Sequence, residues 1–275
     1  MLVTTKEMFA KSREKGYAIV APDFWDSNSC KTYVETAEEL GVPVILSFAQ
    51  AHSEMLSVEE AYALAKYYGE KASVPVAIHL DHGLDVETVK KAVDLGYTSV
   101  MIDASMKSFD ENVETTRKVV EYAHARGVTV EAEIGHVASN FDENDTETLY
   151  TTAEEASSFA EQSGCDSLAI SIGTAHGVYK AKAIPEISFD SLAKIRKATN
   201  VPLVLHGGSG SGDDNLSRCA KEGICKVNIY TDLYLAAMKA LDEEDTSSYF
   251  KVRDALQKGM NECLEHYFKV FGTRA

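Results

Sequence analysis

The chain alternates between short apolar runs and longer segments with helical spacing. The apolar runs are continuous rather than interrupted at every second residue, which is typical of strands buried on both faces of a parallel sheet. Between them, apolar positions recur every three or four residues and predict amphipathic helices. We expect strands at 17–21, 43–48, 75–80, 99–103, 129–134, 167–172, 202–207 and 226–230, and helices that include 29–40, 57–72, 85–95 and 112–127.

This regular repeat predicts an α/β barrel. Roughly eight βα units in ~250 residues is the size of a (β/α)8 TIM barrel, whereas a doubly wound sheet more often has fewer strands and a glycine-rich turn after the first. A glycine directly precedes four of the expected strands, where a residue in left-handed conformation ends a helix. These glycines are Gly41, Gly96, Gly127 and Gly223.

No linker or low-complexity tract divides the chain, so we expect residues 1–275 to form a single domain. A terminal segment, about 232–270, is amphipathic and acidic, and it predicts a C-terminal helical extension of the barrel. The polar stretch 135–152 is too long for an ordinary turn between a strand and a helix. It predicts a mobile loop over the barrel mouth.

Charge and composition narrow the choice of partners. The 275 residues include 27 Lys and Arg against 43 Asp and Glu, a formal net charge of −16, and no basic stripe that would bind a nucleic-acid backbone. No apolar run approaches the ~18 to 20 residues of a membrane span, and the first residues lack the pattern of a secretory signal. The five cysteines form no C-x-x-C pair. We therefore expect a cytoplasmic protein with no nucleic acid and no membrane among its partners.

Metal-binding residue types gather at the carboxyl ends of the expected strands, which is where the catalytic groups of such a barrel lie. Three imidazoles that converge on one barrel mouth leave a fourth zinc position open for a substrate oxygen. The sequence therefore predicts a catalytic metal site. The residues are His79, Asp81 and His82 after strand three, Asp103 after strand four, Glu131 and Glu133 on strand five, His176 after strand six and His206 after strand seven.

The two histidines of the third strand are not equivalent. Side chains alternate along a strand, so His79 and Asp81 point one way while Leu80 and His82 point the other. Both histidines can face one site only if the strand ends between them. We assign His82 to the site and expect His79 to be buried behind it. Asp81 could exchange a proton or orient a neighbouring ligand.

A glycine-rich run after the seventh strand predicts a phosphate site. Residues 206–212 read HGGSGSG and precede an expected helix, so backbone amides can approach an anion there. Phosphate sites after strands seven and eight recur in these barrels, although such a run can also be a flexible turn. Asn228 and Thr231, at the end of strand eight, would complete the cradle.

Six motifs together resemble the class II, metal-dependent fructose-bisphosphate and tagatose-bisphosphate aldolases. The resemblance covers nearly the whole chain, with the motifs in the family's order and spacing. They are HLDHG (79–83), SVMIDAS (99–105), VEAEIG (130–135), IGTAHGVYK (172–180), LVLHGGSG (203–210) and KVNIYTDL (226–233).

The resemblance implies a role for each motif. It implies reversible cleavage of a phosphorylated ketose to dihydroxyacetone phosphate and an aldehyde, through an enediolate that zinc stabilises. A homo-oligomer, a dimer or tetramer, is expected with it. The implied zinc ligands are His82, His176 and His206, with Asp103 and Glu133 at an alternative position for a second metal or a monovalent cation, and Asp81 as the proton donor. The implied substrate-binding residues are Gly177, Gly207, Gly208, Ser209, Gly210, Asn228, Tyr230 and Thr231.

Several positions depart from the family pattern. The family usually has Phe-Asn after strand one and often a Ser after strand two, where this chain has 23–25 (DFW) and Ala49. It has Gly-Gly in the loop where 138–139 (AS) stand, and a small or acidic residue where Tyr230 stands. We infer that metal binding and enediolate chemistry persist, and that the aldehyde half, or the way its distal group is held, is where this chain differs. An acid is also expected in the loop after strand five, but the aligned position holds Phe141, and Asp142 and Glu143 are the nearest candidates.

Three other interpretations remain at this point. A Schiff-base aldolase would use a lysine, and Lys180 and Lys226 lie near strand ends, although neither has an apolar setting in sequence that would lower its pKa. A metal hydrolase would be expected to offer paired histidines on strand one, where 17–24 has none. A non-catalytic or regulatory relative is the third, and the complete set of ligand residues speaks against it.

Overall fold

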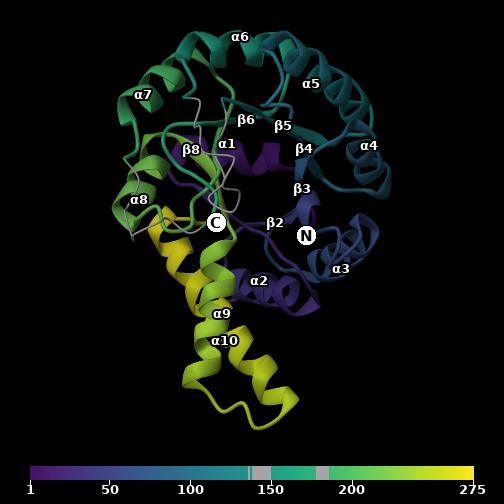
Figure 1. The fold of residues 1–275 in the computed structure, drawn as a ribbon, viewed down its shortest axis with the longest axis vertical. Coiled ribbons are helices and arrows are strands. Elements are labelled where there is room, and N and C mark those ends of the chain that lie inside the picture. The colour runs from purple at the N-terminus through teal and green to yellow at the C-terminus, as the bar shows by residue number, and fades with distance from the viewer. Residues whose placement is uncertain (136, 138–149, 178–185) are drawn as a thin grey trace.

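The computed structural model describes residues 1–135, 137, 150–177 and 186–275, and within them eight parallel strands form one sheet in the order β1-β8-β7-β6-β5-β4-β3-β2. The two outer strands meet at the bridge between Asp23 and Ser47, where the Phe24 amide also donates to the Ser47 carbonyl at 3.0 Å. The sheet therefore closes into a barrel (Figure 1), and the predicted (β/α)8 fold is confirmed. The strands are β1 (Ile19–Pro22), β2 (Val44–Ala49), β3 (Val76–Gly83), β4 (Ser99–Ile102), β5 (Thr129–Ile134), β6 (Ser167–Ile170), β7 (Leu203–Leu205) and β8 (Ile224–Ile229).

Helices surround this barrel, as Figure 1 shows. The four glycines predicted to end helices all adopt positive φ, of 65° at Gly41, 110° at Gly96, 73° at Gly127 and 119° at Gly223. The helices are α1 (Thr5–Lys15), α2 (Ser27–Leu40), α3 (Val58–Lys71), α4 (Val86–Leu95), α5 (Phe109–His124), α6 (Ala153–Ser163), α7 (Phe189–Ala198), α8 (Asp213–Glu222), α9 (Thr231–Glu243) and α10 (Tyr249–Phe271), with a short 3-10 helix, η1 (Gln50–His52), after β2.

Each strand is buried along its whole length, apart from the half-buried His82 of β3. This burial explains why the strands appear in the sequence as continuous apolar runs, because one set of side chains packs under the helices and the other fills the barrel. The amino-terminal end of the barrel is closed by α1. Thr5 of that helix contacts Thr129 at 2.7 Å, and Met8 and Phe9 pack with buried residues of β1 and β2.

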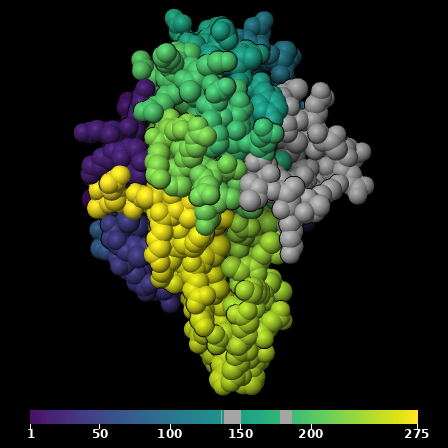
Figure 2. Space-filling view, turned by 90° about the vertical axis from the view of Figure 1, so that its left-hand side faces the viewer, coloured from purple at the N-terminus to yellow at the C-terminus, as the bar shows by residue number. Residues whose placement is uncertain are grey.

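The C-terminal segment over 232–270 is helical, as predicted. It consists of two helices, because α9 ends at Glu243 and α10 begins at Tyr249, and α9 directly follows β8 as the eighth helix of the barrel repeat. The two helices form a hairpin whose far end projects beyond the barrel (Figures 1 and 2). The chain then returns to the barrel, where the Ala18 amide donates to the Phe271 carbonyl at 3.2 Å.

The remaining expectations concern membrane-spanning helices, the cysteines and the loop after strand five. No helix in the described part of the chain is long and apolar enough to cross a membrane. All five cysteines are free, and four of them are buried. The loop predicted over 135–152 lies mostly outside the described residues, together with Phe141, Asp142, Glu143, the Ala138-Ser139 pair and Lys180.

Candidate active site

Three histidines from three strands meet at the carboxyl end of the barrel. His82 lies near the end of β3, while His176 follows β6 and His206 follows β7. Each offers a ring nitrogen within 4.8 Å of the others, and the ring centroids of His82 and His206 are 4.6 Å apart. The structure thus brings together the three histidines that the sequence singled out.

A backbone irregularity directs His82 into this cluster. The pairing of β3 with β4 shifts register between Leu80 and Gly83, and His82 has a positive φ of 43°, which is uncommon for a residue with a side chain. His79 lies deeper in the barrel and is fully buried, as predicted, with Nδ1 2.8 Å from the Ser99 hydroxyl. The regular alternation of side-chain directions along β3 is therefore broken between His79 and His82.

In two of these histidine rings, one nitrogen is hydrogen-bonded to a carboxylate. Nδ1 of His82 lies 2.9 Å from Asp103, and Nε2 of His206 lies 2.9 Å from Glu131. An ionised carboxylate only accepts, so each ring donates there and keeps a lone pair on its other nitrogen when the ring is neutral. Those two remaining nitrogens, His82 Nε2 and His206 Nδ1, face each other at 2.9 Å. Two lone pairs repel at this distance, so the geometry requires either a proton or a cation between them.

Without a metal, His82 is the ring that takes the proton. Burial opposes a charge on His82, but Asp81 and the hydrogen bond to Asp103 raise its pKa to about 10. Burial and the positive charge at His82 lower the pKa of His176 to about 3, and the same two causes lower the pKa of His206. A metal ion would therefore meet two neutral imidazoles, His176 and His206, and would replace the proton on His82.

Asp81 and Glu133 border the histidine cluster, and the pKa values of their carboxyl groups shift in opposite directions. Asp81 is 2% exposed, and its Oδ1 accepts from the Asn228 amide at 2.9 Å. Burial works against ionisation, yet the charge at His82, with His206 and Lys226, holds the pKa of Asp81 far below its usual range. Burial and the charge of Asp103 raise the pKa of Glu133 to about 8, and its Oε2 is buried with no partner among the described residues.

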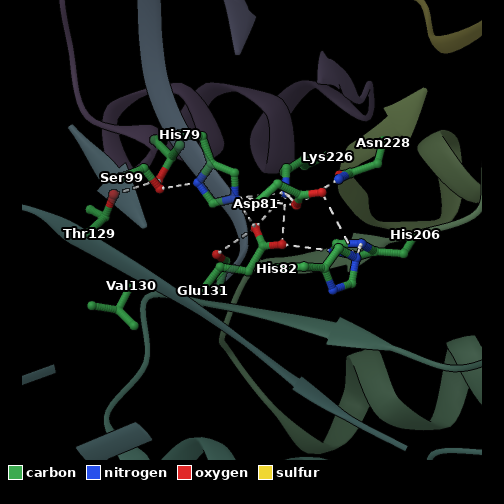
Figure 3. A network of polar contacts seen from close by, with 12 residues as sticks. His79, Asp81, His82, Ser99, Thr129, Val130, Glu131, His206, Lys226 and Asn228 are labelled. Carbon is green, nitrogen blue, oxygen red and sulfur yellow. Dashed lines mark hydrogen bonds and ion pairs between the residues drawn. The ribbon is translucent and has the colours of Figure 1, made fainter. Parts of the chain in front are cut away.

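A buried ion pair lies beneath the cluster, and sequence reasoning missed it (Figure 3). The Lys226 ammonium is fully buried and contacts both oxygens of Glu131, at 2.7 and 2.9 Å. Burial opposes the charge on Glu131, but Lys226 and His206 lower its pKa to about 2. A clue was present, because Glu131 is two residues before Glu133 and Lys226 two before Asn228, on the same faces of their strands.

The glycine-rich segment after β7 passes close to neighbouring backbone. A Cβ added at Gly207, where φ is 67°, would lie 2.5 Å from the Ala175 carbonyl oxygen, and one at Gly208 would lie 2.6 Å from Val227. The Ser209 hydroxyl accepts from the Tyr230 amide at 3.3 Å, which ties this segment to the end of β8. Gly210 stands apart, because its amide donates to Asp232 at 2.9 Å and it does not line the pocket.

A cavity of about 320 Å³ joins these groups. It is lined by every predicted metal, acid-base and substrate residue except His206, which is fully buried, and Gly210. It is also lined by Asp23, directly after β1, and Ala49 of β2, which the sequence marked only as departures. Asp23 is 5% exposed and faces this cavity. The lining residues are Asp23, Ala49, Ala51, His52, Asp81, His82, Leu84, Asp103, Glu133, Val137, His176, Gly177, Gly207, Gly208, Ser209, Asn228, Tyr230 and Thr231.

Comparisons with known proteins agree with this arrangement. The sequence profile of the family described as fructose-bisphosphate aldolase class-II matches residues 3–275. A fructose-bisphosphate aldolase of Staphylococcus epidermidis is 36% identical over 283 residues, covering 99% of this chain and 98% of that protein. The crystal structure of the YdjI aldolase from Escherichia coli K12 superposes with a TM-score of 0.90 at 34% identity, covering 99% of this chain and 98% of that one. The chain belongs to the class-II fructose-bisphosphate aldolase family, and this membership supports aldolase activity.

Proposed function

We propose that this protein is a zinc-dependent aldolase that reversibly cleaves a phosphorylated ketose to dihydroxyacetone phosphate and an aldehyde. The observation that carries the proposal is the pair of lone-pair nitrogens, on His82 and His206, that face each other at 2.9 Å beside His176. His82, His176 and His206 would hold a divalent cation through three imidazole donors, and its charge would relieve this repulsion. The unpartnered Oε2 of Glu133 and the carboxylate of Asp103 suit a second or alternative position nearby.

The donor set fits zinc chemistry. Zinc in catalytic sites is commonly held by three protein ligands, which leaves one position for a substrate oxygen. A bound zinc ion supplies Lewis-acid stabilisation of the negative charge that develops on the substrate when the carbon–carbon bond beside a ketone breaks. Asp103 and Glu131, through their hydrogen bonds, hold His82 and His206 in the tautomers that present lone pairs to the ion.

We infer that Asp81 moves a proton in the reaction. Its carboxylate is ionised and buried, Oδ2 lies 3.9 Å from His82 Nε2, and the Asn228 amide fixes the other oxygen. In the cleavage direction Asp81 accepts the proton of the hydroxyl that becomes the aldehyde, and in the reverse direction it returns that proton. Gly177, Gly207 and Ser209 line the adjacent wall and are proposed to hold the phosphate of the dihydroxyacetone-phosphate half.

The Schiff-base alternative has little support at Lys226. A lysine that attacks a ketone must be uncharged and reach the substrate. Lys226 is fully buried below the cavity, does not line it, and is ion-paired with Glu131. Its setting is thus charged rather than apolar, and Lys180 lies outside the described residues.

The test is a screen of phosphorylated ketoses for release of dihydroxyacetone phosphate, with a coupled dehydrogenase as readout. We expect release that a chelator abolishes and that added zinc restores. Release that survives chelation and is blocked by borohydride in the presence of substrate would contradict the metal-dependent proposal in favour of a Schiff base.

A further inference from the structure

The cavity has two unlike walls. His82, His176 and the glycine-rich segment line the side formed by β3 to β8. The second wall comes from the residue after β1, the end of β2 and the segment after β2. It contributes Asp23, Ala49, Ala51 and His52, with Tyr230, which follows β8, at its border. If the phosphate half of a ketose lies on the first side, the aldehyde half must face this second wall.

Asp23 is the most unusual member of the second wall. It directly follows β1, and its backbone amide donates to the Ile229 carbonyl at 3.1 Å, which fixes its position between β8 and β2. Its side-chain Oδ1 is buried and has no hydrogen-bond partner among the described residues. Buried polar atoms are nearly always paired, so an unpaired one facing a cavity indicates a group supplied by a ligand or a water.

Two neighbouring polar atoms also lack a hydrogen-bond partner among the described residues. Nδ1 of His52 and Oδ1 of Asn228 are buried without a partner in the described part of the chain, and both residues line the cavity. The His52 ring packs against Tyr230, with centroids 4.6 Å apart, and Trp25 contacts the same tyrosine at 5.8 Å. The second wall therefore combines aromatic surface with two buried polar atoms, Asp23 Oδ1 and His52 Nδ1, that have no partner among the described residues, and Asn228 of β8 adds a third such atom to the cavity.

This wall is unsuited to an anion. None of the described lining residues is a lysine or arginine, so a second phosphate would find no lysine or arginine among them. Burial and the charge of Asp81 raise the pKa of Asp23 well above its usual range, and burial lowers the pKa of His52. The Asp23 carboxyl group accepts a hydrogen bond from a hydroxyl whether or not it is protonated, and it offers no positive charge to a phosphate.

We propose that Asp23 is a specificity residue whose carboxyl group binds an uncharged hydroxyl of the aldehyde half, so that the substrates are ketose phosphates with no second phosphate at the distal end. This inference rests on the proposed aldolase function and assigns the part of the substrate that the histidine and glycine wall does not contact. A site built to bind a hydroxyl group rejects an analogue that lacks it, because its own polar groups then stay unpaired.

The test uses the condensation direction in the zinc-loaded protein, with dihydroxyacetone phosphate and three aldehydes: glyceraldehyde, glyceraldehyde 3-phosphate and propanal. We expect kcat/KM for glyceraldehyde to exceed that for glyceraldehyde 3-phosphate by about 10-fold or more. The Asp23→Ala variant should lose about 10- to 100-fold with glyceraldehyde and much less with propanal, which has no hydroxyl. Asp23→Asn keeps a donor and an acceptor and should retain most of the preference, which guards against a folding artefact.

A matched control and a separate readout complete the design. Asp242→Asn, on the exposed side of α9, removes one carboxylate far from the cavity and should leave the ratios among the three aldehydes unchanged. A native preference for glyceraldehyde 3-phosphate, or an equal loss with all aldehydes in Asp23→Ala, would overturn the inference. Exchange of the carbon-bound hydrogen of dihydroxyacetone phosphate with solvent needs no aldehyde. If native protein fails to catalyse it, the proposed function itself fails; if exchange occurs with the wrong aldehyde preference, only the role of Asp23 fails.

Discussion

The Lys226 ammonium lies 2.7 Å from Oε1 of Glu131 inside the barrel, and neither side chain is more than 1% exposed. The same oxygen accepts from Nε2 of His206 at 2.9 Å, so one carboxylate joins a buried cation to a histidine of the three-histidine cluster (Figure 3). The ion pair thereby fixes the tautomer of His206 and turns its Nδ1 toward His82.

Removal of the cation should be costly. Lys226→Met preserves much of the side-chain volume but leaves Glu131 buried without its partner, so we expect a loss of about 3–5 kcal/mol in the free energy of unfolding, measured in urea. Lys239→Met, at an exposed lysine paired with Glu243, should cost less than about 1 kcal/mol. The double variant Lys226→Met with Glu131→Gln should recover part of the loss. A single Lys226 variant as stable as the native protein would show that the pair does not matter for stability.

Stability should also depend on pH through Glu131. Its folded-state pKa, about 2, is below its ordinary value of 4.5, so the unfolded chain binds the proton more readily. The stabilisation is therefore complete above about pH 4.5 and is lost as the pH falls toward 2. Between these limits the unfolding free energy of native protein should fall more steeply than that of Glu131→Gln. Parallel pH profiles would mean that the folded-state pKa of Glu131 is not lowered.

Zinc binding should require all three histidines. We expect one zinc ion per chain after dialysis of native protein, and a loss of affinity of more than about 100-fold in His82→Ala, His176→Ala or His206→Ala, because loss of an outer hydrogen-bond partner alone costs about 10- to 100-fold. His266→Ala, at an exposed histidine of α10, is the control and should bind zinc normally. Metal analysis by atomic absorption gives the answer. Native-like zinc content in all three variants would remove this cluster as the metal site.

Asp81 should be needed for turnover and dispensable for metal binding. In Asp81→Ala we expect a fall in kcat of about 100- to 10,000-fold, the usual contribution of an acid-base group, with zinc content unchanged. Both quantities are measured on one preparation with the best ketose from the screen. A variant that loses its zinc would instead identify Asp81 as a residue that holds the metal or its ligands in place.

The barrel was predictable from the sequence because its strands are buried on both faces and its helices end at glycines. The placement of His82, His176 and His206 followed from the same rule, since all three lie at or beyond the carboxyl ends of strands. The ion pair of Lys226 with Glu131 was missed. The spacing along each strand indicates which face each residue shares, but 95 residues separate the two, and only closure of the barrel brings them together across its interior.

Local backbone geometry accounts for the other differences. The turn at His82, with φ of 43°, reverses the alternation that the sequence of β3 implies. The Gly210 amide was expected to face an anion, but the nearby Asp232 carboxylate accepts from it. The break between α9 and α10 was not predicted, although the polar residues 244–248 end in Ser248, which caps α10 by accepting from the Lys251 amide. The first two differences depend on a single dihedral angle and on a contact between residues 22 positions apart.

The central claim is that a metal held by the three histidines makes the carbon-bound hydrogen of dihydroxyacetone phosphate exchangeable. The most direct measurement is the rate at which this hydrogen exchanges with deuterated solvent, followed by NMR without any aldehyde, in zinc-loaded, chelator-treated and His206→Ala protein. We predict rapid exchange in the zinc-loaded protein, none above background in the other two, and recovery when zinc is returned to the chelated sample. Exchange at equal rates in the loaded and metal-free proteins would contradict the account.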